Sequence, residues 1–214
     1  MSKKIGSAII AFVVFTLLLM NIDVHAVENL IQNGDFEDGQ VGWAVAARGA
    51  AAMNLVIDDK QAVVGKKSAR LEIKNVGGGG VHDLTLDCQT PISIKNGKTY
   101  TVDFWLKSEK DRTITIDFLM NHDPWTRAFQ VENIPITAEW QVKFHTFKAA
   151  FGDNNMIFLF SFSKASNQNP KVTTWIDHVR FYQGEYEEED LSEKSKAVTS
   201  DGKLPLTWGN LKRR

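Results

Sequence analysis

A period of two in the apolar residues is the feature that most limits what this chain can fold into. In the stretch "YTVDFWLK", residues 100–107, every second residue is apolar, and "TITIDFLM", residues 113–120, repeats the pattern. Successive side chains of a strand point to opposite faces, so each stretch has one apolar face and one mostly polar face. Both stretches are therefore predicted to be half-buried β-strands.

The same pattern recurs along most of the chain, with turn signals between the runs. Further strands are predicted at residues 69–74, 81–90, 127–131, 140–148, 156–163 and 172–182. Turn-forming sequences such as Asn96-Gly97 separate them, and no helix of normal length is predicted. Many short strands with one apolar side predict an all-β fold, in which two antiparallel sheets pack face to face as a sandwich or jelly roll.

The two ends of the chain differ in composition from the middle. Residues 1–26 have a basic start, an apolar stretch and a Val24-His25-Ala26 sequence, which together predict a cleaved signal peptide and a secreted protein. The alternative is a membrane anchor, for which the apolar stretch is short. We expect residues 27–184 to form one domain. Residues 185–214 are expected to be a charged, disordered linker with a C-terminal tag, "KLPLTWGNLKRR", that either docks a partner or has no structure.

Charge and cysteine content exclude some classes of protein. The formal net charge is −1, and acids and bases are mixed along the chain, so the basic surface of nucleic-acid-binding proteins is absent from the sequence. The single cysteine, Cys88, excludes an internal disulfide. Cys88 alternates with Leu84 and Leu86, which favours a buried thiol over a reactive one.

Acidic residues at both ends of the predicted domain indicate a metal site. In "TTWIDHVRFY" the apolar alternation changes phase at Asp177-His178. This change predicts a β-bulge, which can turn the side chain of the acid out of the sheet. The other end, "NLIQNGDFEDGQVGW", has acids at Asp35, Glu37 and Asp38. Ca²⁺ takes about six to eight oxygen ligands, and a site that joins the two ends would stabilise a sandwich without disulfides.

Several blocks of the sequence resemble one known family. The blocks "NLIQNGDFEDGQVGW", "VVGKKSARLEI", "NGKTYTVDFWLKS", "EWQVKFHTFKA" and "WIDHVRFY" occur in the order and spacing of the carbohydrate-binding modules of families 4 and 9, close to family 22. The resemblance covers almost all of residues 29–182. It implies a jelly roll with a structural calcium ion and a sugar-binding cleft on one sheet, and a protein that binds polysaccharide without catalysis.

The resemblance also implies which residues hold the calcium ion. It assigns carboxylate ligands to Glu37 and Asp177, and backbone carbonyl ligands to Val64 and Lys67. Asp35 is instead expected to bond within its own turn, as acids after Asn-Gly commonly do.

A sugar cleft needs flat aromatic rings for the C–H faces of the sugar and planar polar side chains for its hydroxyls. Trp105 lies on the outward side of its predicted strand. Trp125 follows Pro124 in a loop, where related modules often carry a stacking aromatic residue. The polar candidates are His82, Asn121, Arg127 and Gln130. For each of these residues, simple packing or solvation is the alternative.

The residues leave three classes of function open. Non-catalytic binding of a β-glucan or xylan is the principal hypothesis, and the sequence does not choose between these glycans. A glycoside hydrolase would need two carboxylates about 5–10 Å apart, and the outward-facing Asp103 and Asp117 are the available pair. The third class is a secreted sandwich that binds a protein or a cell-surface partner.

Overall fold

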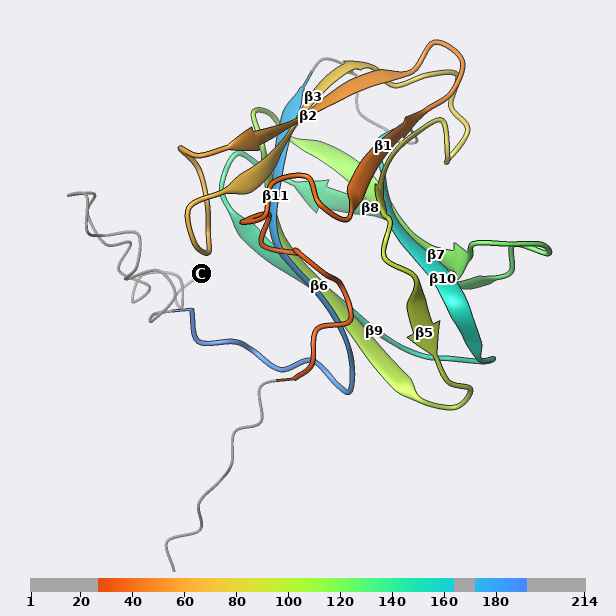
Figure 1. The fold of residues 1–214 in the computed structure, drawn as a ribbon. Helices are drawn as coiled ribbons and strands as arrows, with labels where there is room; N and C mark the ends of the chain where they lie inside the picture. The colour runs from red at the N-terminus through yellow and green to blue at the C-terminus, as the bar shows by residue number, and fades with distance from the viewer. Residues whose placement is uncertain (1–26, 164–171, 192–214) are drawn as a thin grey trace, which may run out of the picture.

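Two antiparallel sheets stacked face to face make up the fold (Figure 1). The structure, a computed structural model, describes residues 27–163 and 172–191. Sheet A has the order β1 (Trp43–Ala47), β4 (Leu84–Cys88), β10 (Asp153–Ser161), β7 (Arg112–Met120) and β8 (Arg127–Ile136), and β5 (Ile92–Ile94) pairs with β10. Sheet B has the order β2 (Ala52–Asp58), β3 (Ser68–Asn75), β11 (Thr173–Gln183), β6 (Thr99–Ser108) and β9 (Gln141–Lys148). The predicted all-β sandwich is confirmed.

The core lies between the inward faces of the two sheets, where the predicted alternation places it. On β6, Tyr100, Val102, Phe104 and Leu106 are all buried. Phe104 meets Phe160 of sheet A edge-to-face, with ring centroids 4.9 Å apart, so side chains of the two sheets interdigitate. The thiol of Cys88 is buried, as predicted.

Three strands were not predicted. β1 and β2 precede the first predicted strand, and β5 is only three residues long. The sequence of β1, "WAVAA", is apolar without alternation, so a pattern search for period two does not detect it. The described residues form no helix, and therefore none that could cross a membrane. The predicted signal peptide and the C-terminal tag lie outside the described residues.

The predicted bulge in β11 is present. The register of β11 against β6 shifts between Asp177 and Arg180, and His178 adopts a positive φ of 49°. The N-terminal segment packs on this bulge, because the N–H of Val179 donates to the carbonyl of Gly34 at 2.8 Å. A Cβ at Gly34 would lie 2.0 Å from the carbonyl oxygen of Val179, so the contact requires glycine.

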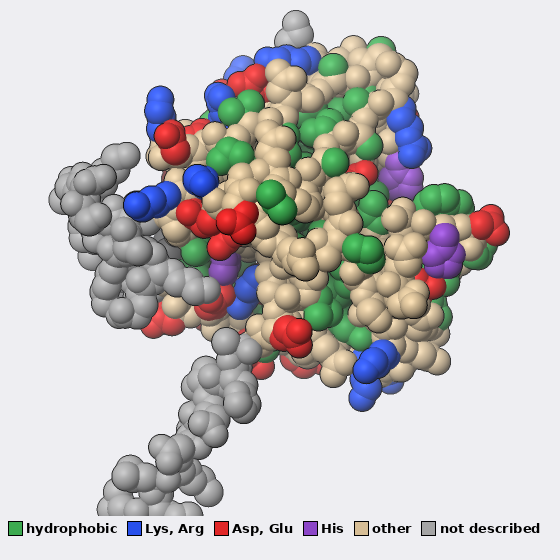
Figure 2. All heavy atoms as spheres, in the orientation of Figure 1, with side chains coloured by type: hydrophobic (Ala, Val, Ile, Leu, Met, Phe, Trp, Pro, Cys, Tyr) green, Lys and Arg blue, Asp and Glu red, His purple; other side chains and the backbone are tan. Residues whose placement is uncertain are grey.

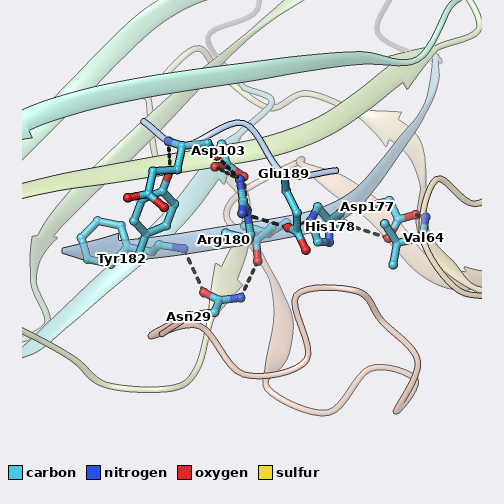
Figure 3. A network of polar contacts seen from close by, with 11 residues as sticks. Asn29, Val64, Asp103, Asp177, His178, Arg180, Tyr182 and Glu189 are labelled. Carbon is cyan, nitrogen blue, oxygen red and sulfur yellow. Dashed lines mark hydrogen bonds and ion pairs between the residues drawn. The ribbon is translucent and has the colours of Figure 1, made fainter. Parts of the chain in front are cut away.

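The side chain of Asn29 also joins the start of the domain to β11 (Figure 3). Its Nδ2 donates to the carbonyl of Val179 at 3.0 Å, and its Oδ1 accepts from the N–H of Phe181 at 2.9 Å. Asn29 therefore completes backbone hydrogen bonds that the bulge leaves open.

The chain after residue 184 departs from expectation, because residues 185–191 pack on the outer face of sheet B. The ring of Tyr186 stacks on Phe144 of β9, with centroids 3.8 Å apart. The carboxylate of Glu189 accepts from Arg180 at 2.8 Å and contacts His178 at 2.7 Å (Figure 3). Leu191 is buried. The acids of this segment predicted a solvated linker, but the carboxylate of Glu189 instead pairs with β11.

We expect a chain that ends at Gly184 to be less stable than a chain that ends at Leu191 by about 2–4 kcal/mol. The shorter chain loses one buried leucine and one aromatic stack, in addition to the Glu189 contacts. Urea denaturation of the two truncated proteins measures the difference. Equal free energies of unfolding would show that residues 185–191 contribute nothing to the fold.

Candidate functional site

A loop covers part of the outer face of sheet A. Thr85, Thr115, Ser161 and Ser163 point away from the core between core residues, yet all four are buried. The loop of residues 76–83 lies over them: the hydroxyl of Ser163 donates to the carbonyl of Gly80 at 2.6 Å, and the hydroxyl of Ser161 donates to that of Val81. The run of four glycines at residues 77–80 belongs to this cover. The part of the face near the β7–β8 hairpin remains accessible.

Asp117 of β7 organises that accessible part. Its side chain is fully buried and accepts two hydrogen bonds from Arg127, Nε to Oδ1 at 2.7 Å and Nη2 to Oδ2 at 2.8 Å. Nε2 of Gln130 donates to it at 3.2 Å, and Nε2 of His82 lies 2.9 Å from it. The hydrogen bonds that Arg127 donates to Asp117 raise the pKa of Arg127, which stays charged. One buried acid therefore fixes three polar side chains.

Trp125 stands beside this group at the tip of the hairpin. It follows the cis Asp123–Pro124 peptide, has a φ of 58°, and is 56% exposed. A cavity of about 490 Å³ is lined by Arg48, His82, Leu119, Trp125 and Arg127. An exposed ring next to fixed planar donors is the arrangement that sugar faces and sugar hydroxyls require.

The structure brings most of the predicted ligand residues together. Trp125, His82 and Arg127 line the cavity, and Gln130 contacts the same Asp117. Asn121 is exposed in the β7–β8 loop, where its backbone N–H donates to the carbonyl of Asn155 at 2.8 Å. The exception is Trp105, which lies on β6 in sheet B, away from Trp125.

Two members of the site were missed from the sequence. Arg48 follows β1, a strand that the alternation did not reveal, and Leu119 was taken only as part of its strand. Asp117 was noted as an outward acid, but its role depends on the pairing of β7 with β8, which places Gln130 opposite Asp117.

A second acid, Asp87, points outward from β4 near the same cavity. Burial raises the pKa of Asp87, and a hydrogen bond with the Thr85 side chain and the nearby charges of His82 and Arg48 oppose that rise. Its Oδ1 is buried with no hydrogen-bond partner among the described residues. The ionised form of Asp87 is therefore poorly stabilised in the fold.

The residues predicted to hold calcium also lie together, around the loop of residues 63–67. Asp177 accepts from the N–H groups of Val63 and Val64 at 2.6 and 3.1 Å (Figure 3). Glu37 accepts from the N–H groups of Lys66 and Lys67 at 2.6 and 2.8 Å. Acids from both ends of the domain therefore hold one loop.

Asp177 and Asp35 bring two carboxylates close together here, although the described residues hold no cluster of three or more His, Cys, Asp or Glu side chains around one point. Burial raises the pKa of Asp177 to about 7 against the effect of its backbone hydrogen bonds, and the charge of Asp35 adds to the rise. The Asp177 carboxylate accepts hydrogen bonds from the backbone N–H groups of Val63, Val64 and His178. A buried carboxylate next to a second acid is stabilised by a divalent cation. Oδ1 of Asp35 accepts from the N–H of Glu37 at 3.4 Å, in the expected local turn.

Comparison with known proteins agrees with this arrangement. The family model described as "Carbohydrate binding domain", which covers modules of types 4 and 9, matches residues 28–167. The chain belongs to this carbohydrate-binding domain family. No curated protein matches the chain.

Solved structures of carbohydrate-binding domains share the fold. A CBM4 structure has a TM-score of 0.59 and 24% identity, covering 72% of this chain and 99% of that chain. The N-terminal cellulose-binding domain of Cellulomonas fimi β-1,4-glucanase C has a TM-score of 0.53 and 18% identity, covering 75% and 100%. The CBM22-1 xylan-binding domain from Paenibacillus barcinonensis Xyn10C has a TM-score of 0.52 and 13% identity, covering 76% and 98%.

We expect Asp87→Asn to stabilise this carbohydrate-binding domain by about 1 kcal/mol at pH 7, because the variant removes a poorly stabilised buried charge. The raised pKa means that the folded protein binds the proton more tightly than the unfolded chain. Stability is therefore lost as pH rises from the unfolded pKa through the folded one. The gain in Asp87→Asn should shrink below pH 4, where both states are protonated. Urea denaturation at pH 3.5 and pH 7 measures this, and equal effects at both pH values would contradict it.

Proposed function

We propose that the protein is a non-catalytic module that binds polysaccharide in the cavity beside Trp125. The observation that carries the proposal is the exposed Trp125 ring next to Arg127 and His82, both held by the buried Asp117. Membership of a carbohydrate-binding family supports it. β-Glucans and xylans are the glycans to test first, because similar folds include domains named for binding cellulose and xylan.

Binding at this site depends on side chains that are already in place. Asp117 holds Arg127 by two hydrogen bonds, and the sheet holds Asp117, so little side-chain freedom is lost when a sugar binds. The Trp125 ring provides an apolar face for the sugar C–H groups. Arg127 and Gln130 provide donors for the sugar oxygens.

The positions of the acids support a role without catalysis. Asp103 and Asp117 both point away from the core, but Asp103 is on β6 of sheet B and Asp117 is on β7 of sheet A. The two therefore lie on opposite outer faces, so they do not form the carboxylate pair considered from the sequence. Each is also engaged by an arginine, Asp103 by Arg180 at 2.8 and 2.6 Å.

We also propose that the domain is secreted and holds a structural Ca²⁺. The ligands would be the carboxylates of Glu37 and Asp177, with backbone carbonyls of Val64 and Lys67. When bound, the cation would offset the charges of the buried acids. The hydrogen bonds that backbone N–H groups of residues 63–67 donate to the carboxylates of Asp177 and Glu37 support this role, since a cation there would fix both chain ends against one loop.

We expect Trp125→Ala to weaken glycan binding by about 10- to 100-fold and to leave the free energy of unfolding within about 0.5 kcal/mol, because the ring is exposed. Calorimetric titration with soluble β-glucan and xylan oligosaccharides measures the affinity. Trp105→Ala, on the outer face of sheet B, is the matched control and should bind normally. A loss in the control with no loss in Trp125→Ala would move the binding face to sheet B. Absence of binding to every glycan would favour a structural or adhesive role.

We expect EDTA to lower the melting temperature and millimolar calcium to restore it, because a ligand that binds only the folded state stabilises it. Asp177→Asn should abolish the calcium-dependent difference, whatever its own baseline stability. Glu72→Gln, which removes an acid on β3, should retain it. A full calcium shift in Asp177→Asn would place the metal elsewhere.

A further inference from the structure

The described residues that line the cavity beside Trp125 include cationic side chains and no acid. They are Arg48, His82, Leu119, Trp125 and Arg127. From this lining we propose that the site selects sugars that carry an anionic group, either a carboxylate or a sulfate ester. The inference rests on the proposed function, because it names the class of glycan that the same site takes.

The guanidinium of Arg127 is held in one orientation and is partly exposed, as binding of an anion requires. Its Nε and one N–H of Nη2 donate to Asp117, and Glu132 of β8 interacts with its charge. The side chain is 43% exposed, so the remaining N–H groups face the cavity and solvent. A guanidinium pairs with a carboxylate or sulfate through parallel N–H···O bonds, and Asp117 fixes the orientation of the plane.

Arg48 adds a second charge to the lining of the cavity. Its backbone N–H donates to the carbonyl of Asp83 at 2.7 Å, which holds it next to the loop that carries His82. The Arg48 side chain is exposed. Figure 2 shows a histidine and a basic side chain next to each other at the edge of the molecule, where the loop before β4 lies. The same cavity is therefore lined by two guanidinium groups.

The acids near the cavity do not line it. Asp117 is fully buried beneath Arg127. Asp83 accepts from the N–H groups of Gly78 and Gly80 at 3.0 and 2.9 Å. The charge of Asp87 interacts with Arg48, and the exposed Glu132 interacts with Arg127 from β8. A neutral sugar could accept hydrogen bonds from the two arginines, whereas an acidic sugar would accept them as stronger, charge-assisted bonds.

The test compares each acidic glycan with its own neutral form on the full chain. Oligogalacturonates and glucuronoxylan oligosaccharides are titrated before and after reduction of their carboxyl groups to alcohols, and κ-carrageenan oligosaccharides before and after desulfation. We expect at least one acidic form to bind about tenfold or more tightly than its neutral form, and the preference to fall as salt rises. The uronate and sulfate arms identify which anion is recognised.

Variants separate charge recognition from general damage. Arg48→Gln should lower the affinity for the acidic form by more than it lowers the affinity for the neutral form, and so remove most of the preference. Lys98→Gln, which removes one exposed charge in the turn before β6, is the matched control and should retain the preference. Asp87→Asn should strengthen binding of the acidic form, because it removes a negative charge near Arg48 and His82, and a gain in affinity does not arise from misfolding.

The outcomes distinguish this inference from the function on which it rests. Equal or tighter binding of the neutral forms would overturn the selection of anionic sugars, while the proposed glycan binding would stand. Binding of neither form of any glycan would instead refute the proposed function. A preference that survives in Arg48→Gln and disappears in Lys98→Gln would also overturn the inference, because the anionic group of the sugar would then bind outside the cavity beside Trp125.

Discussion

The bulge in β11 is the constraint on which the rest of the domain depends. Ile176 faces the core before the bulge, and Val179 and Phe181 face it afterwards, so one strand keeps an apolar inner face on both sides of a change in phase. The extra residue breaks the pairing with β6 and leaves Asp177 directed at the loop of residues 63–67. The N-terminal segment and residues 185–191 both attach at this same place, through Val179 and through His178 and Arg180. Both ends of the domain are thus held by a single irregularity.

Much of this fold could be predicted because its signals are local. The alternation in β6 and β7 and the phase change at Asp177 are visible within ten residues, and the structure confirms them. The location of Trp105 was not predictable in the same way. An outward position on β6 says that the side chain avoids the core, but it does not say on which of two sheets the strand lies, and that depends on pairing between distant strands.

The candidate site was predicted in part for a related reason. Trp125 and Arg127 occur in one hairpin, so a short stretch of sequence identifies them together. Arg48 comes from a segment that the fold brings against that hairpin, and nothing in its local sequence indicates it. His82 lies on another such segment, and it was among the polar candidates predicted from the sequence. The packing of residues 185–191 was missed because their acids predict solvation, while their partners on sheet B, among them Arg180 and Phe144, lie elsewhere in the sequence.

Each outer face of the sandwich carries an aspartate–arginine pair, and the arginine is covered on one face and exposed on the other. On each face a buried aspartate is paired with an arginine by two hydrogen bonds, Asp103 with Arg180 and Asp117 with Arg127. On sheet B the other donors of Arg180 are taken by the carbonyl of Glu187 and the carboxylate of Glu189, and the side chain is only 11% exposed. On sheet A no part of residues 27–163 and 172–191 covers Arg127, which is 43% exposed beside Trp125. The pairing with aspartate therefore stabilises both faces, and the face that these residues leave uncovered retains the donors that a ligand needs.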